Sequence, residues 1–131
     1  MKERLGRQTM LELYGCKNEH LNDIEFIKTA LLKAAEIAKA TIVQQYFHQF
    51  SPYGISGTVV ITESHINIHT WPEHDFAAID FFTCNDDMEV EKACAYLKEV
   101  FEAVEQKMEG HDRGSMLRVR RLLEQRRELK V

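Results

Sequence analysis

The sequence contains no long apolar run, few cysteines and few prolines. No stretch approaches the roughly 20 apolar residues that a membrane span requires, so we expect no membrane partner. Met1-Lys2-Glu3-Arg4 is not followed by a hydrophobic signal core, and we expect a cytoplasmic protein. The 3 cysteines are an odd and sparse set, which excludes a disulfide scaffold and predicts thiols in a reducing compartment.

An excess of positive charge is also missing. The chain has 17 lysines and arginines against 21 acidic residues, a net charge of −4, so nucleic acid is not an expected partner. The basic residues near the end of the sequence are Arg118, Arg120, Arg121, Arg126, Arg127 and Lys130. Glu124 and Glu128 interleave with them, and this pattern predicts a solvated helix face.

The length and composition fit one globular domain. A chain of 131 residues predicts a single domain over residues 1–131. A domain of this size buries roughly two-thirds of the surface of its unfolded chain, so its core needs neither a metal nor a disulfide. The hydrophobic fraction of 44% and the charged fraction of 29% are ordinary for such a domain.

Two segments have apolar residues at helical spacing. Asn22 and Glu25 are expected to form a capping box for the first helix, and Asp86 and Glu89 for the second. The first apolar stripe consists of Ile24, Ile27, Leu31, Ala34, Ala35 and Ala38. The second consists of Val90, Ala93, Cys94, Leu97, Val100, Phe101 and Val104. Each helix therefore has one face to bury.

Five further segments are rich in β-branched and aromatic residues and are predicted to be strands. They are residues 9–14, 41–50, 55–62, 65–70 and 76–83. Turn residues separate them at 51–54 and 73–75. A loop is expected at 110–114 and a short strand at 115–119, followed by a helical or disordered tail.

These elements predict an α/β fold, a two-layer sandwich. Successive strands joined by turns pair antiparallel, and two helices with one apolar stripe each cover one face of the sheet. The other face of the sheet then needs a cover. A second subunit would supply it, so we expect a homodimer.

Ser64 lies in the most informative segment, Thr62-Glu63-Ser64-His65-Ile66-Asn67-Ile68-His69. A metal site is disfavoured, because strand periodicity puts His65 and His69 on one face about 13 Å apart and no third ligand is suitably spaced. A serine hydrolase is disfavoured because the glycines of a nucleophile elbow are absent. Ser64 and His69 are also closer in sequence than the members of hydrolase triads.

Two of the cysteines have different predicted settings. Cys94 falls on the apolar stripe of the second helix and is expected in the core. Cys84 follows a strand and precedes a predicted helix N-terminus, a position that exposes a thiol and lowers its pKa. Cys84 is therefore the candidate for proton transfer.

Three segments together resemble the prokaryotic S-adenosylmethionine decarboxylase proenzyme family. They are Ser56-Gly57-Thr58-Val59-Val60-Ile61-Thr62-Glu63-Ser64-His65, His69-Thr70-Trp71-Pro72-Glu73 and Asp80-Phe81-Phe82-Thr83-Cys84. The resemblance begins near Leu5 and fades after Gly114. It implies that the Ser64 hydroxyl attacks the Glu63 carbonyl, which yields a β chain of residues 1–63 and an α chain of residues 64–131. Ser64 becomes a pyruvoyl group, which forms a Schiff base with the substrate amine and acts as an electron sink.

The resemblance also implies roles for other residues near the cut. His69 resembles the base of self-cleavage, Ser56 its second processing residue, and Cys84 the acid that returns a proton to the substrate. The implied activity is decarboxylation of S-adenosylmethionine to the aminopropyl donor of spermidine and polyamine synthesis.

Three residues resemble the family's substrate-binding positions. Phe50 resembles the aromatic residue that stacks on adenine, and Glu73 the carboxylate that binds the ribose hydroxyls. Leu5 also lines the implied site. In the family this site lies at a dimer interface, so these side chains are expected to serve a neighbouring subunit.

Two alternatives stay open. The family commonly has glycine where Asp75 and Asn85 stand, beside Glu73 and Cys84, and relatives with the same cofactor decarboxylate arginine or ornithine. Both residue types tolerate a left-handed backbone. A different class of function is an uncleaved homologue that binds a nucleoside or regulates a partner without catalysis.

Overall fold

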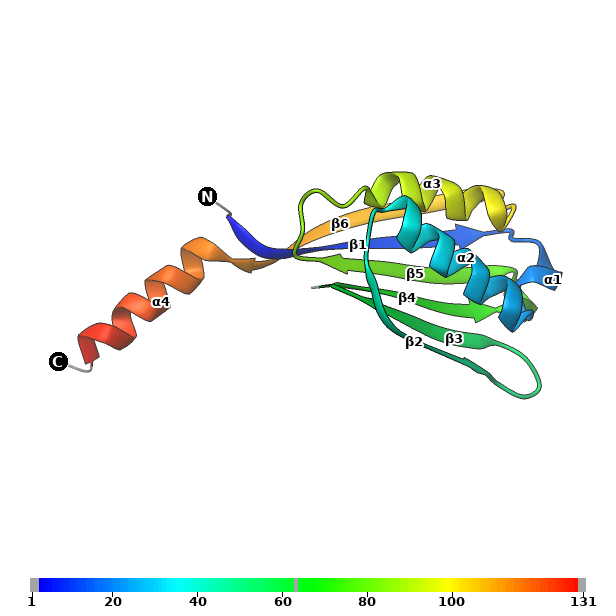
Figure 1. The fold of residues 1–131 in the computed structure, drawn as a ribbon, viewed down its shortest axis with the longest axis horizontal. Helices are drawn as coiled ribbons and strands as arrows, with labels where there is room; N and C mark the ends of the chain where they lie inside the picture. Colours follow the sequence, from blue (N-terminus) through cyan, green and yellow to red (C-terminus); the bar gives the residue numbers. More distant parts are fainter. Residues whose placement is uncertain (1–2, 63, 130–131) are drawn as a thin grey trace.

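The chain forms a six-stranded antiparallel sheet with two helices across one face (Figure 1). A computed structural model describes residues 3–62 and 64–129. The elements are β1 (Arg4–Tyr14), α1 (Asn18–Leu21), α2 (Ile24–Ile37), β2 (Ile42–Gln49), β3 (Ile55–Ile61), β4 (Ser64–Trp71), the 3-10 helix η1 (Pro72–His74), β5 (Phe76–Thr83), α3 (Val90–Val100), β6 (Glu105–Ser115) and α4 (Met116–Leu129). The predicted two-layer α/β sandwich is confirmed.

The strand order is β2-β3-β4-β5-β1-β6. Strands β2 to β5 pair with their neighbours in sequence, whereas β1 lies between β5 and β6 and pairs antiparallel with both. Strands from before residue 63 (β1, β2 and β3) therefore share the sheet with strands from after it (β4, β5 and β6). They meet at three places, β3 against β4, β5 against β1, and β1 against β6.

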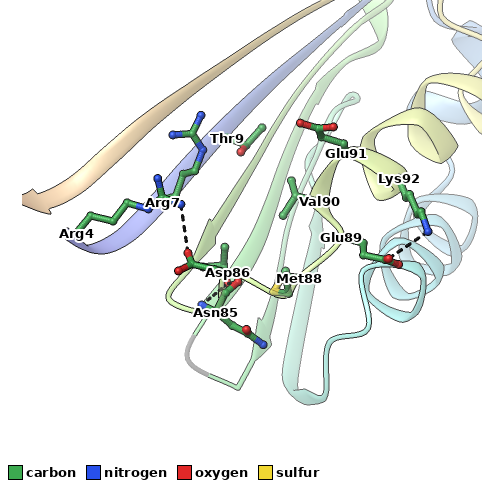
Figure 2. A pocket seen from close by; sticks show the side chains of 11 residues that line it. Arg4, Arg7, Thr9, Asn85, Asp86, Met88, Glu89, Val90, Glu91 and Lys92 are labelled. Carbon is green, nitrogen blue, oxygen red and sulfur yellow. Dashed lines mark hydrogen bonds and ion pairs between the residues drawn. The ribbon is translucent and has the colours of Figure 1, made fainter. Parts of the chain in front are cut away.

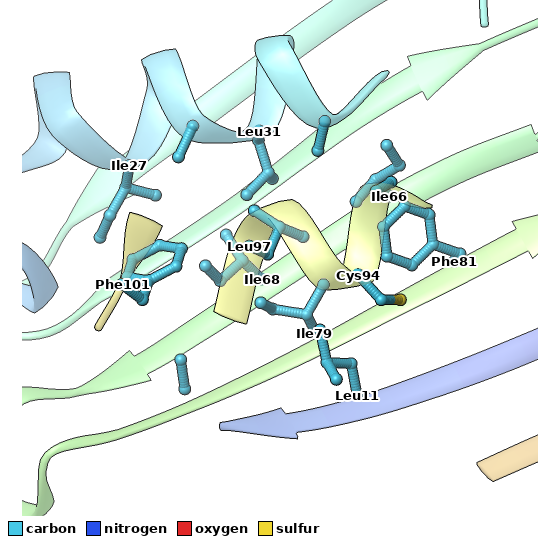
Figure 3. Close-up of a cluster of buried hydrophobic side chains, with 14 of the residues drawn as sticks. Leu11, Ile27, Leu31, Ile66, Ile68, Ile79, Phe81, Cys94, Leu97 and Phe101 are labelled. Atoms are coloured by element: carbon cyan, nitrogen blue, oxygen red, sulfur yellow. The ribbon is translucent and has the colours of Figure 1, made fainter. Parts of the chain in front are cut away.

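The hydrophobic core fills the space between the sheet and the helices α2 and α3 (Figure 3). Alternate residues of β1, β3, β4 and β5 point into it, since strand side chains alternate between faces. The side chains labelled in Figure 3 are all buried. They are Leu11, Ile27, Leu31, Ile66, Ile68, Ile79, Phe81, Cys94, Leu97 and Phe101. Both predicted helix stripes thus contribute to one core.

The opposite face of the sheet is mixed polar and aromatic. Helices α2 and α3 both lie on the core side, and α4 extends away from one end of the sheet (Figure 1). The arginines of α4 are exposed, as expected for a solvated face. Every helix within residues 3–62 and 64–129 is too short or too polar to cross a lipid bilayer. We call the side of the sheet away from α2 and α3 the open face.

The first strand and the first helix differ from their predicted limits. Strand β1 begins at Arg4 rather than at residue 9, because β5 and β6 bond to it from both sides. The N-cap of α2 is Asp23, whose side chain accepts a hydrogen bond from the Phe26 amide at 3.1 Å. The predicted cap was wrong, because the Asn22 side chain accepts a bond from the Gly54 amide at 2.9 Å instead.

The start of the second helix was also predicted wrongly. Helix α3 begins at Val90 with Glu89 as its N-cap residue, and no side chain bonds the cap. Asp86 instead pairs with Arg4, at 3.2 Å between Oδ1 and Nη2, and that pair removes it from the helix. Val104 lies beyond the helix and is 75% exposed, so it does not extend the stripe.

The last part of the chain differs most from the prediction. Gly110 and Gly114 lie within β6, where a loop was expected. A Cβ atom at Gly110 would meet the Arg7 side chain, so the glycine makes room for that guanidinium beside the strand. Residues 115–119 were predicted as a strand, but α4 begins at Met116.

Candidate active site

Ser64 begins β4 and points to the core side of the sheet. It is 9% exposed and lies opposite Thr83 of β5 in the antiparallel register. Its Oγ donates a hydrogen bond to Thr83 Oγ1 at 3.0 Å. Glu63, on the other side of the expected cleavage bond, lies outside the described residues.

The turn after β5 is tied to the same threonine. Thr83 Oγ1 accepts a bond from the Asn85 amide at 3.0 Å and lies 3.2 Å from the Asn85 carbonyl oxygen. The Asn85 side chain in turn accepts a bond from the Asp87 amide at 2.9 Å. The residues before and after Cys84 therefore both make hydrogen bonds that hold the turn in which Cys84 lies.

The three cysteines differ in burial. Burial raises the pKa of Cys16 to about 11 and that of Cys94 to about 12, so both are protonated at neutral pH. Cys84 is only partly buried. Its predicted place at a helix N-terminus was wrong, because α3 begins six residues later, at Val90, and the effect of a helix end fades within one turn.

Charged residues hold this end of the sheet together (Figure 2). Arg4 pairs with Asp86 at 3.2 Å and with Asp112 of β6 at 2.9 Å, and Arg7 pairs with Asp112 at 2.8 Å. The hydrogen bond to Asp86 raises the pKa of Arg4, which stays charged. Arg4, Arg7 and Asp86 help line a cavity of about 310 Å³ that also reaches Thr83. The turn that carries Cys84 is thus joined to β1 through Arg4, which also binds Asp112 of β6.

A second group of predicted site residues lies on the open face. His69 of β4 faces Ser56 of β3 in register, and His69 Nδ1 lies 2.8 Å from Ser56 Oγ. Phe50, the residue after β2, is 49% exposed. Phe50, Ser56, His69 and Glu73 all line one cleft of about 260 Å³, together with Trp71. The structure therefore brings four of the predicted residues together.

The two groups are separated within one chain. Ser64 is buried on the core side, whereas His69 is exposed on the open face. Five residues of strand put them roughly 16 Å apart along β4. Leu5 lies two residues before Arg7, the register partner of Thr83, and so belongs to the end of the sheet that carries Ser64. A single chain does not place His69 beside Ser64.

The two histidines of β4 have separate partners. His65 stacks on Phe82 at 5.6 Å between ring centroids, and its Nε2 lies 3.6 Å from Asp80 Oδ2. His69 bonds to Ser56 instead. Among the described residues, no three histidine, cysteine or acidic side chains are grouped so that they would hold a metal ion.

The two substitutions for glycine behave differently. Asp75 has a left-handed backbone, with φ of 51°, and its carboxylate accepts a bond from Asn18 Nδ2 at 3.1 Å. The turn beside Glu73 is therefore kept without glycine. Asn85 does not have a positive φ, so its role is the hydrogen bonding of the turn after β5.

Sequence reasoning missed Thr83, Arg4 and Asp86 as members of this site. Thr83 was visible in Asp80-Phe81-Phe82-Thr83-Cys84, but its pairing with Ser64 depends on the register of β4 and β5. That register is set by the length of the turn between the strands, including η1. The Arg4–Asp86 pair spans 82 positions of sequence and left no local pattern.

Comparisons with known proteins identify relatives of this chain and of its fold. The family model described as S-adenosylmethionine decarboxylase matches residues 7–114. An S-adenosylmethionine decarboxylase proenzyme from Acidithiobacillus ferrooxidans is 52% identical over 99 residues, 76% of this chain and 74% of the relative. Another from Thermosipho africanus is 48% identical over 110 residues, 84% and 85% of the two chains. The crystal structure of the adenosylmethionine decarboxylase from Aquifex aeolicus superposes with a TM-score of 0.79 and 32% identity, over 86% of this chain and 93% of that one.

Proposed function

The chain belongs to the S-adenosylmethionine decarboxylase family, an enzyme family of carboxy-lyases, and from this premise we propose its reaction. The proenzyme cuts itself between Glu63 and Ser64 into chains 1–63 and 64–131. Ser64 becomes a pyruvoyl group, and the mature protein removes CO₂ from S-adenosylmethionine. The product is the aminopropyl donor of spermidine synthesis, and we place the reaction in the cytoplasm.

The surroundings of Ser64 fit a pyruvoyl group. The residue that would carry it starts a strand, is held by Thr83 and is largely shielded from water. A pyruvoyl group supplies a ketone that takes up the electrons released with CO₂. We assign the return of a proton to the substrate to the partly buried Cys84, which lies two residues from Asp86 and its pair with Arg4. The buried Cys16 and Cys94 cannot serve, because both lie in the hydrophobic core, away from a bound substrate.

Self-cleavage needs a proton acceptor for the Ser64 hydroxyl. His69 is the candidate base, and Ser56, 2.8 Å from its Nδ1, fixes the orientation of the ring. The Ser56 hydroxyl can donate to a bare Nδ1 or accept from a protonated one, so the contact holds the ring in place in either tautomer. We assign the base to His69 and its orientation to Ser56.

The cleft of about 260 Å³ is the observation that favours S-adenosylmethionine as substrate. Phe50 offers an aromatic face for adenine, and Glu73 in the same cleft offers two acceptor oxygens to the ribose hydroxyls. Arginine and ornithine, the alternative substrates, contain neither group. A role for Leu5 beside the substrate is part of the same proposal.

The division of the site supports a homodimer. Ser64 and Cys84 lie at one end of the sheet, and Ser56, His69 and Glu73 lie farther along it on the open face. A second copy, packed on the open face and reaching past the ends of the strands, would supply the missing group to each Ser64, which is the first residue of β4. The same packing would cover a sheet face that carries neither α2 nor α3.

Two measurements test this proposal. Denaturing mass spectrometry of the purified protein should give two chains that divide after residue 63, with the second beginning in a pyruvoyl group. Release of CO₂ from S-adenosylmethionine, arginine and ornithine should then be found for the first substrate only. A chain that remains whole after prolonged incubation would instead support the uncleaved, non-catalytic homologue.

Glu73→Gln should raise KM for S-adenosylmethionine about tenfold or more, because a charged acceptor is worth roughly 1.5–3 kcal/mol to its hydrogen bonds. The rate of self-cleavage should stay the same, since Glu73 binds only the substrate. Steady-state kinetics and intact-mass measurements check both. Glu105→Gln, an exposed carboxylate on β6, is the matched control. An unchanged KM in Glu73→Gln would remove this residue from the ribose site.

A further inference from the structure

We propose that Thr83 is a positioning residue for self-cleavage, which fixes the direction of the Ser64 hydroxyl and holds the turn that carries Cys84. This inference rests on the proposed function. It concerns a side chain that neither attacks a carbonyl nor donates a proton to the substrate. Its hydroxyl lies between the two residues that do.

The hydrogen bonds around Thr83 determine which atom donates. A hydroxyl has one proton and two lone pairs. The Asn85 amide, 3.0 Å away, can only donate, and the Asn85 carbonyl oxygen, 3.2 Å away, can only accept. The Thr83 proton therefore goes to that carbonyl, and one lone pair goes to the amide. The second lone pair accepts the proton of Ser64 Oγ at 3.0 Å.

This arrangement prepares Ser64 as a nucleophile. Its proton points at Thr83, so both of its lone pairs stay outside that bond, and under the proposed function one of them attacks the Glu63 carbonyl carbon. In the acyl shift, the bond from that carbon to the Ser64 nitrogen breaks and a bond to Ser64 Oγ forms. The Oγ proton leaves its hydrogen bond to Thr83, goes to the base, and passes from the base to the nitrogen. Thr83 neither gains nor loses a proton in this step.

Because Ser64 is buried, the direction of its hydroxyl depends on its protein partner rather than on water. Ser64 and Thr83 are each 9% exposed, so water is poorly placed to replace the bond between them. Without its partner, Ser64 Oγ can turn among the three staggered rotamers of its side chain. The fraction of molecules with a lone pair aimed for attack would fall.

The same hydroxyl also restrains Cys84. Thr83 and Asn85 flank this cysteine. Thr83 Oγ1 donates to the Asn85 carbonyl and accepts from the Asn85 amide, and the two bonds close the turn around Cys84. The ion pair between Asp86 and Arg4 fixes Asp86, which follows Asn85 in the turn (Figure 2). Loss of the hydroxyl would therefore loosen the part of the turn nearest to Ser64.

The first test measures self-cleavage in a cell-free translation reaction by intact mass. Thr83→Val keeps the shape of the side chain and removes the hydroxyl, and it should slow cleavage roughly tenfold, the worth of one hydrogen bond. Thr83→Ser should restore a rate within about threefold of the unchanged chain. Thermal melting of both variants shows that they fold.

Thr70→Val is the matched control. Thr70 is another buried threonine of the sheet, 5% exposed, whose hydroxyl bonds to Leu21 and Ile55 rather than to Ser64. It should lose stability and keep the cleavage rate. If Thr70→Val slowed cleavage as much as Thr83→Val, the effect would be one of stability, and the proposal would be wrong.

The second test uses chains that cannot cleave, and so it needs no cofactor. In a Ser64→Ala background, Thr83→Val should raise the rate of Cys84 alkylation by iodoacetamide about threefold or more, as followed by peptide mass spectrometry. An unchanged rate would overturn the restraint of Cys84 by Thr83. If the unchanged chain itself stayed whole, the proposed function would fail. If that chain cleaved and Thr83→Val cleaved equally fast, only the present inference would fail.

Discussion

At the scale of single residues, the chemistry depends on how much water reaches each reactive group. The chain has three thiols, and the sheet and helices bury two of them while leaving one at a turn. The sulfur of Cys16 points to the Leu13 carbonyl, and Cys94 is packed among the apolar side chains under α3. Selectivity among chemically identical groups thus comes from position alone.

Alkylation should reveal this selectivity. At pH 8, iodoacetamide should modify Cys84 first, because the pKa of Cys16 is raised to about 11 and that of Cys94 to about 12. The thiolate is the reactive form, and a raised pKa delays its appearance to higher pH. Peptide mass spectrometry over a pH series measures the order. If Cys94 reacted as early as Cys84 in the folded protein, its burial would be in doubt.

At the scale of elements, periodicity predicted most strands and both main helices, because one face of each is buried. The details that failed were decided by competition between distant residues. Asp86 has the right type and spacing to cap α3, but Arg4 binds it. Gly110 and Gly114 have the composition of a loop, but pairing with β1 makes them part of β6.

The candidate site was predictable only in part, for the same reason. Residue types and family motifs identified Ser64, His69 and Cys84 as candidates. The face on which each side chain lies follows from strand alternation, which separates Ser64 from His69. The partners of each side chain depend on register, and Thr83 was therefore invisible until the strands were paired.

The N-cap of α2 gives a test at this scale. Asp23→Ala should lower the free energy of unfolding by about 1 kcal/mol, because the Phe26 amide loses its acceptor. Asp23→Asn, which keeps an acceptor oxygen, should be nearly neutral. Urea unfolding in a Ser64→Ala background measures both with a single intact chain. Equal stability of Asp23→Ala and the parent would contradict the cap.

At the scale of the whole molecule, the proposed nucleophile and the proposed base lie on two surfaces that one chain cannot bring together. Ser64 faces the core side, and His69 faces the open side some residues along the same strand. A complete site therefore requires two copies, under the proposal made above. This requirement makes a distinctive genetic prediction.

Two inactive variants should complement each other. Ser64→Ala lacks the nucleophile and His69→Ala lacks the base, so each alone should stay whole. When the two are co-expressed, a mixed dimer places His69 of one chain beside Ser64 of the other. Only the His69→Ala chain should then be cut, as resolved by intact mass. No cleavage in the mixture would argue that each chain processes itself.

The order of the strands makes folding before cleavage different from refolding after it. Strand β1 lies between β5 and β6, and β3 lies beside β4. A cut after residue 63 therefore leaves two fragments whose strands are paired with each other in one sheet. They stay together without any covalent link, because each completes the ladders of the other. The kinetic order of folding, however, differs before and after the cut. The precursor assembles its own sheet by a unimolecular process, whereas the mature fragments, once unfolded, must find each other by diffusion. Folding must therefore precede cleavage, and mature fragments that unfold in dilute solution do not readily refold.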